Sequence, residues 1–277
     1  MSILVYHSPH NSLMLNISSK TSPKEIMEKI QKLREQKGKE KETLELIRRA
    51  SLYGNDFVVN LFWEKALTYH HLMMDEEAKG EKANNEKRIQ YLLKMEDAVK
   101  HAGYFIVRFD QDRWKHRLYR FLGRVAEFKK EYKRAVSYYV KSLKFAKSDP
   151  DYLEKGYPRW FEVEGLLSSS LILAGQTTKG HLMAENVYRK FDTDKEAINL
   201  KKSDLTTWLI WRSGIPIRTI NALIDKSVIF DIKEAQKWLE DAEKLLVSAK
   251  DMPLWADLKY RLTELKTVRE RLENKEN

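Results

Sequence analysis

The sequence contains no cysteine and has few of the residues that interrupt helices. Disulfides and thiolate metal sites are therefore excluded. Only 10 glycines and 6 prolines occur among 277 residues, which argues against glycine-rich phosphate loops and favours long helices. No apolar run approaches the roughly 18 residues that a membrane span needs. Residues 1–17 lack the basic start and long apolar centre of a signal peptide, so we expect a cytoplasmic protein.

The composition that remains is that of a basic helical protein. Lysine and arginine total 51 against 41 acidic residues, a formal charge of +10 that can attract acidic proteins, nucleic acid or anionic lipid. Apolar residues make up 42% of the chain, enough for a large core. Strand-like alternation is unconvincing after residue 17. The sequence therefore predicts an all-α fold.

Apolar residues recur every three or four positions in segments that short polar turns separate. The expected helices lie at about 23–33, 42–54, 57–78, 86–102, 111–129, 131–147, 158–174, 179–191, 205–213, 231–249 and 253–272. A break is expected at Gly214-Ile215-Pro216, and a proline at position 253 would begin the last helix. We expect residues 1–22 to form a tail or small hairpin, 23–273 one helical domain and 274–277 a frayed end.

Residues 116–150 carry the most informative pattern in the chain. Its members are Tyr119, Leu122 and Gly123 in a first helix, Glu131-Tyr132 at a turn, Ala135, Tyr138, Tyr139, Ser142 and Leu143 in a second helix, and Pro150 at the end. This segment resembles a tetratricopeptide repeat (TPR). In that family Gly123, Ala135 and Tyr139 would pack the two helices together. The resemblance implies an α-solenoid of antiparallel helical hairpins, a TPR-like right-handed superhelix, with at least three stacked units.

Four arginines follow one side of the expected helix 111–129. Arg113, Arg117, Arg120 and Arg124 are four, three and four positions apart. Like charges at this spacing repel by roughly 0.2–0.5 kcal/mol per pair, so stability alone does not favour them. Guanidinium groups suit carboxylates and phosphates. The family resemblance implies that they line a concave groove, where Tyr119 and Trp160 would add apolar contact.

The favoured hypothesis is a non-enzymatic adaptor or scaffold that binds an acidic peptide or partner surface in this groove. On this hypothesis, replacing Arg117, Arg120 and Arg124 by glutamate abolishes partner capture and leaves thermal stability nearly unchanged. Three alternatives stay open: a basic face neutralised by acids on neighbouring helices, a helical-repeat protein that binds RNA or single-stranded DNA, and a structural subunit of a larger assembly.

Catalytic and cofactor motifs do not emerge from the sequence. The segment from Gly175 to Gly180 departs from a phosphate-binding loop, because His181 occupies the position of the essential lysine. His71 and Asp75 are one helical turn apart, but two ligands are too few for a metal site. We therefore predict no enzyme activity, no cofactor and no metal ion, and the sequence leaves the oligomeric state open.

Overall fold

The computed structural model describes residues 22–50, 55–77, 79, 82–109, 111–228, 230–249 and 256–276. Within these residues the regular structure is entirely helical, which confirms the all-α prediction. The tail or hairpin expected before Ser22 lies outside the described residues, and so does the helix start expected at Pro253.

Thirteen α-helices occur in the described part of the chain. They are α1 (Pro23–Arg34), α2 (Glu40–Ala50), α3 (Asn55–Glu77), α4 (Asn85–Arg108), α5 (Lys115–Phe128), α6 (Tyr132–Lys144), α7 (Pro150–Lys155), α8 (Trp160–Leu173), α9 (Thr177–Thr193), α10 (Lys195–Ser203), α11 (Leu205–Asp225), α12 (Ile232–Val247) and α13 (Ala256–Glu276). Short 3-10 helices at Asp112–Trp114 and Ala146–Ser148 precede α5 and α7.

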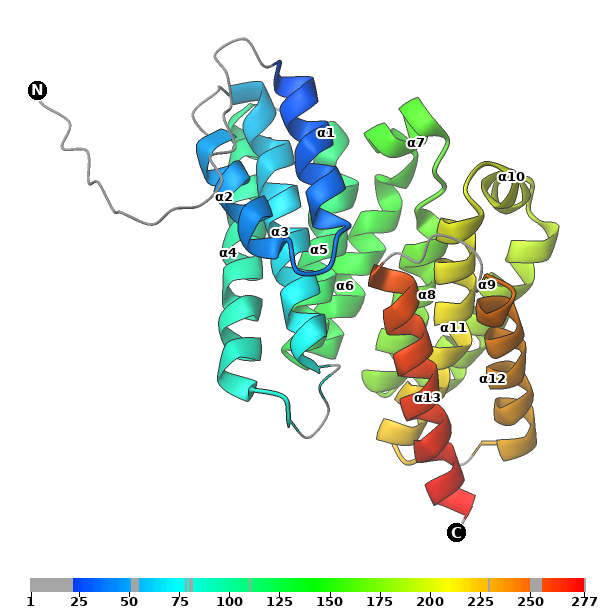
Figure 1. The fold of residues 1–277 in the computed structure, drawn as a ribbon. Helices are drawn as coiled ribbons and strands as arrows, with labels where there is room; N and C mark the ends of the chain where they lie inside the picture. Colours follow the sequence, from blue (N-terminus) through cyan, green and yellow to red (C-terminus); the bar gives the residue numbers. More distant parts are fainter. Residues whose placement is uncertain are drawn as a thin grey trace, which may run out of the picture.

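Consecutive helices pack in pairs. The most extensive contacts join α3 with α4, α5 with α6, and α8 with α9, and α11 packs on α12 in the same way. Each pair touches the next through α4 and α5, α6 and α8, and α8 and α11. Figure 1 shows this succession of neighbouring helices, with α1 and α13 lying in front of it. The chain therefore builds its core step by step from near neighbours in sequence.

The α5–α6 pair shows why small residues are needed where helices cross. A Cβ atom on Gly123 would lie 2.4 Å from Cε1 of the Tyr139 ring, a distance that real Cβ contacts do not reach. Ala135 and Tyr139 on α6 are fully buried beside it. The ring of Tyr139 thus occupies the space that any other residue at position 123 would need.

A second close approach, between α8 and α9, involves backbone rather than a side chain. A Cβ on Gly180 would lie 2.5 Å from the carbonyl oxygen of Ser168. The turn before it contains Gly175, whose φ of +89° is in the left-handed region that glycine favours. The segment from Gly175 to Gly180 is therefore a helix-helix turn followed by a tight crossing point.

The break expected at Gly214-Ile215-Pro216 is wrong, because α11 continues through these residues to Asp225. A proline inside a helix removes one backbone hydrogen bond and costs about 3 kcal/mol. Every residue from Ser213 to Ile217 is buried, and α11 packs against α8, α9, α12 and α13. Burial on all sides offsets the local cost of the proline.

Helices α7 and α10 are absent from the sequence prediction, and both begin with an aspartate cap. Asp149 accepts a hydrogen bond from the backbone N–H of Asp151 (2.9 Å), and Asp194 accepts one from Glu196 (2.8 Å). Pro150 occupies the first turn of α7 and so begins a helix instead of only closing the repeat. Helix α13 extends to Glu276, past the expected end at Leu272.

A cationic cavity as the candidate binding site

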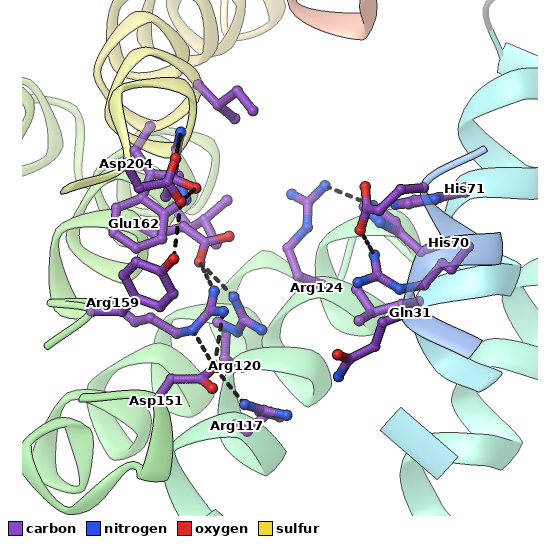
Figure 2. A pocket seen from close by; sticks show the side chains of 18 of the residues that line it. Gln31, His70, His71, Arg117, Arg120, Arg124, Asp151, Arg159, Glu162 and Asp204 are labelled. Carbon is purple, nitrogen blue, oxygen red and sulfur yellow. Dashed lines mark hydrogen bonds and ion pairs between the residues drawn. The ribbon is translucent and has the colours of Figure 1, made fainter. Parts of the chain in front are cut away.

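A cavity of about 470 Å³ is lined by side chains from several helices. Side chains from α1, α3, α5, α7, α8, α11 and α13 line it, and none comes from α4, α6, α9 or α12. In each of the four helix pairs, therefore, the first helix faces the cavity and the second lies away from it. Figure 2 shows two walls, with Arg117, Arg120 and Arg159 on one side and Gln31, His70 and His71 on the other.

Cationic side chains outnumber acidic ones in the lining by nine to six. Seven of the nine are arginines: Arg34, Arg117, Arg120, Arg124, Arg159, Arg218 and Arg261. The cavity therefore has a positive surplus inside a partly desolvated space, where charges interact more strongly than in water.

Three arginines and two carboxylates form a continuous network on one wall. Asp151 accepts from Arg117 at 2.5 Å and from Arg159 at 2.9 Å. Glu162 accepts from Arg120 at 2.5 Å and lies 3.7 Å from Arg159. The network joins α5 to α7 and α8.

The arginines hold both carboxylates in their charged form. Burial alone would raise the pKa of Glu162, but Arg120 and Arg159 outweigh it and lower that pKa to about 2. The same balance applies to Asp151, where Arg159 and Arg117 overcome burial and lower the pKa well below its ordinary value. At neutral pH neither carboxylate carries a proton to donate, so the network is suited to binding rather than to acid catalysis.

Arg124 extends from α5 between the two walls. Its guanidinium donates to Glu127 at 2.6 Å and lies 3.5 Å from Nε2 of His70. Burial and the nearby Arg124 lower the pKa of His70 well below its usual value, so this imidazole is neutral at physiological pH. On the wall that carries His70, Glu64 accepts hydrogen bonds from Arg34 at 2.7 Å and from Gln31 at 3.3 Å.

The structure brings together only part of the predicted binding set. Arg117, Arg120 and Arg124 line the cavity. Arg113 is exposed and stacks on Trp114 instead. Tyr119 stacks on Tyr138 and Phe145, outside the cavity lining. Trp160 likewise lies outside it and packs edge-on against Tyr152, with ring centroids 4.9 Å apart.

The ion pairs change what a charge reversal of Arg117, Arg120 and Arg124 would do. Each of these arginines already contacts a carboxylate of the chain, namely Asp151, Glu162 and Glu127. Three glutamates would place like charges at close range in a partly buried site, which is strongly destabilising. The expectation that thermal stability stays nearly unchanged is therefore replaced by an expectation of destabilisation.

Sequence reasoning missed Arg159, Arg218 and Arg261 as members of the site. They lie between 35 and 137 residues from Arg124 and belong to different helical segments, so no local spacing connects them. One local signal was present: Gly214 inside the helical pattern of α11 marks a place that side chains approach closely.

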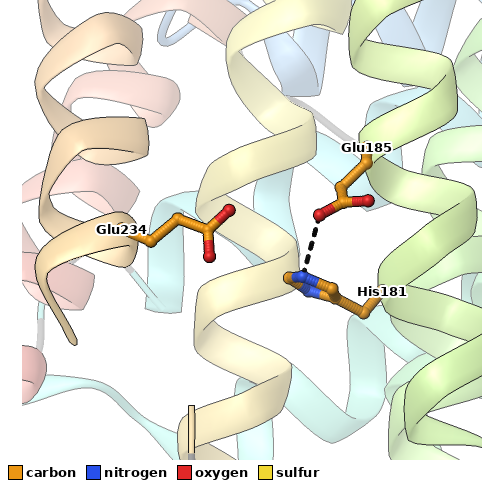
Figure 3. Close-up of side chains that lie close together, drawn as sticks. All are labelled: His181, Glu185 and Glu234. Carbon is orange, nitrogen blue, oxygen red and sulfur yellow. Dashed lines mark ion pairs between the residues drawn. The ribbon is translucent and has the colours of Figure 1, made fainter. Parts of the chain in front are cut away.

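A separate cluster on α9 and α12 has the composition of a metal site. Ligand atoms of His181, Glu185 and Glu234 all lie within 4.8 Å of one another. His181 and Glu185 already form an ion pair at 3.2 Å (Figure 3), and Glu234 is exposed. Nδ1 of His181 is buried without the acceptor that usually orients a metal-binding imidazole. This cluster is better described as a surface ion pair.

Comparison with protein-family models and with curated proteins gave no match. Among the described residues, none of the helices combines the length and the apolar character that crossing a bilayer requires.

Proposed function

We propose that this chain is a non-enzymatic helical-repeat scaffold that binds an acidic segment of a partner protein in the cationic cavity. One observation carries the proposal: the first helix of every pair contributes to a single cavity in which cationic side chains exceed acidic ones. A TPR-like superhelix would present its first helices on a concave inner surface in this way. The α-solenoid and the family relationship are parts of the same proposal, and a cytoplasmic location stays a prediction.

The charge pattern favours an acidic ligand. Arginine forks bind carboxylates through paired, charge-assisted hydrogen bonds. The network of Arg117, Arg120 and Arg159 orients these groups in advance, which lowers the entropy lost on binding. Asp151 and Glu162 hold the arginines in place.

The test is binding of a labelled acidic peptide, measured by fluorescence anisotropy at several salt concentrations. A peptide of the same length with lysines in place of its acidic residues, and a uridine oligonucleotide, are measured beside it. We expect the acidic peptide alone to bind, with affinity that falls as salt rises. Preferential binding of the oligonucleotide would instead support the nucleic-acid alternative.

A matched pair of variants locates the site. Arg120→Gln with Glu162→Gln removes one cavity ion pair, and Arg212→Gln with Asp192→Asn removes an ion pair (2.6 Å) that lies outside the cavity lining. Both double variants keep the net charge of the chain. We expect the first to weaken peptide binding about tenfold, or ~1.4 kcal/mol, and the second to leave it unchanged. Equal affinities for both variants would contradict binding in this cavity.

A further inference from the structure

Arg218 differs from the other arginines of the cavity. Arg34, Arg117, Arg120, Arg124, Arg159 and Arg261 all contact a carboxylate. Arg218 on α11 is partly buried, yet it forms no hydrogen bond or ion pair with any residue in the described part of the chain. Its Nε is a buried donor without an acceptor, as are those of Arg117 and Arg120, but only Arg218 among these three also lacks a carboxylate partner. A buried cation without a partner is costly, so a structure that keeps one has a use for its charge.

The acids whose charge acts on Arg218 already pair with other arginines. Glu264 and Glu127 both influence its charge, but Glu264 is paired with Arg261 and Glu127 with Arg124. Burial and the neighbouring Arg261 lower the pKa of Arg218 to about 9, so its guanidinium is still protonated at neutral pH. The donors of Arg218 are thus charged and unoccupied.

The missing side chain of Gly214 on α11 leaves space for two guanidinium groups, one from Arg218 of α11 and one from Arg261 of α13. A Cβ at this position would lie 2.7 Å from Nη2 of Arg218 and 3.0 Å from Nε and Cζ of Arg261. Arg218 also lines a second cavity of about 260 Å³, together with Asn221 of α11 and Arg271 of α13. Two cations converge where an open space meets a glycine, which is the arrangement that an anion between them would satisfy.

We propose that Arg218, with Arg261 beside it, is the anchor that takes an oxyanion of the ligand, a carboxylate or a phosphate group. The inference rests on the proposed function, since it names the group of the acidic ligand that reaches deepest and the residue that receives it. Guanidinium forks bind both oxyanions through paired N–H donors. The other arginines then serve the remainder of the ligand.

The test uses small anions and the whole protein, without any peptide. Thermal unfolding is followed in inorganic phosphate, in acetate and in chloride at equal ionic strength. We expect phosphate, acetate or both to raise the midpoint by about 2–4 °C over chloride once the anion exceeds its dissociation constant about tenfold. A response to phosphate alone identifies a phosphate site, and a response to acetate identifies a carboxylate site.

Two variants on α11 decide whether Arg218 is responsible. Arg218→Gln should abolish the anion response, whereas Arg212→Gln, which removes a charge from the same helix outside the cavity lining, should retain it. In chloride Arg218→Gln should unfold at the same temperature as the wild type or higher, because it removes an unpaired buried cation. An unchanged anion response in Arg218→Gln, or no response in the wild type, overturns the proposal.

A measurement on the wild-type protein covers the case in which a variant fails to fold. The Nε–H resonance of Arg218 in a ¹H–¹⁵N spectrum should shift on addition of phosphate or acetate, and should not shift in chloride. No shift with either anion overturns the assignment. Peptide binding without an anion response would support the scaffold function and overturn only the role of Arg218 as anchor. An anion response without peptide binding would support the anion site and contradict the scaffold function.

Discussion

At the scale of single residues, the structure explains why glycine is required at one helix crossing and not at another. Gly123 faces the ring of Tyr139, which is fixed in the α5–α6 interface by a hydrogen bond from its hydroxyl to Glu127 (2.6 Å). Gly103 on α4 faces the end of Leu118, where a Cβ would lie 3.2 Å from a flexible methyl group. The two positions differ in how easily the neighbour can move.

We therefore expect Gly123→Ala to destabilise the protein by about 1–3 kcal/mol or more, although alanine is the better helix former. Gly103→Ala is the control, and its free energy of unfolding should stay within about 1 kcal/mol of the wild type. Urea unfolding measures both. Equal effects of the two substitutions would show that the Tyr139 ring does not restrict position 123.

The small-residue pattern of α5 and α6 was readable from sequence because it is local. Gly123, Ala135 and Tyr139 lie within 17 residues, and helical periodicity places them on facing sides. Gly180 and Gly214 perform similar tasks, but what approaches them is the backbone of α8 in one case and side chains that include Arg261 in the other. Neither contact has a sequence spacing that predicts it.

At the scale of helices, some features follow from neighbouring residues in the sequence and others from tertiary packing. The capping box of Ser22 and Glu25 at the start of α1 has a local cause, since both residues lie within one helical turn. The break expected in α11 is wrong because burial of the whole segment, a tertiary effect, outweighs the local cost of Pro216. The continuity of α11 therefore depends on its tertiary surroundings, which local signals do not contain.

The cap of α7 connects helix stability to the cavity. Asp149 is fully buried and caps the helix that carries Asp151, the acceptor of Arg117 and Arg159. Replacing Asp149 by alanine should cost about 0.5–2 kcal/mol and weaken binding of the acidic peptide, because Asp151 loses its fixed position. The measurements are urea unfolding and peptide anisotropy.

Asp231→Ala on α12 is the matched control for this cap. Asp231 accepts from the backbone N–H of Glu234 at 3.2 Å, and its helix does not line the cavity. The Asp231→Ala substitution should destabilise the protein by a similar amount without changing its affinity for the peptide. Weaker peptide binding in this variant as well would mean that the effect of Asp149→Ala is a general loss of stability.

At the scale of the whole molecule, the carboxylates of the cavity act as links between helices. Glu162 on α8 receives Arg120 of α5 and lies beside Arg159. Because its pKa is lowered from the ordinary 4.5 to about 2, its stabilising effect is complete above pH 4.5 and disappears as the pH falls towards 2. Acid should therefore loosen the wall that joins these helices.

Glu162→Gln tests this link. At pH 7 the variant should be less stable than the wild type by on the order of 3 kcal/mol, and the difference should shrink steadily between pH 4.5 and pH 2. Urea unfolding across this range measures it. Glu243→Gln, which removes an exposed partner of Arg269, should differ little from the wild type at every pH. A difference for Glu162→Gln that does not change with pH would contradict the role of its charge.

The cavity itself could be foreseen only in part. The arginine spacing on α5 placed Arg117, Arg120 and Arg124 on one helix face, which local periodicity can do. Glu127, which pairs with Arg124, lies on α5 itself. Asp151 and Glu162, together with Arg218 and Arg261, come from α7, α8, α11 and α13, and their positions depend on how the helix pairs follow one another. The arginine spacing in the sequence therefore indicated where positive charge gathers, but not which arginine of the cavity would lack a carboxylate partner.

Because some helices line the cavity and others do not, a label can be attached to the protein away from the cavity. Since α4, α6, α9 and α12 contribute nothing to the cavity lining, a dye or a surface tether attached to them leaves the ligand's path open. The chain has no cysteine, so one introduced thiol, such as Lys133→Cys on the exposed side of α6, would be its single attachment point. A biosensor could be built on the back of this protein without touching the surface that recognises its target.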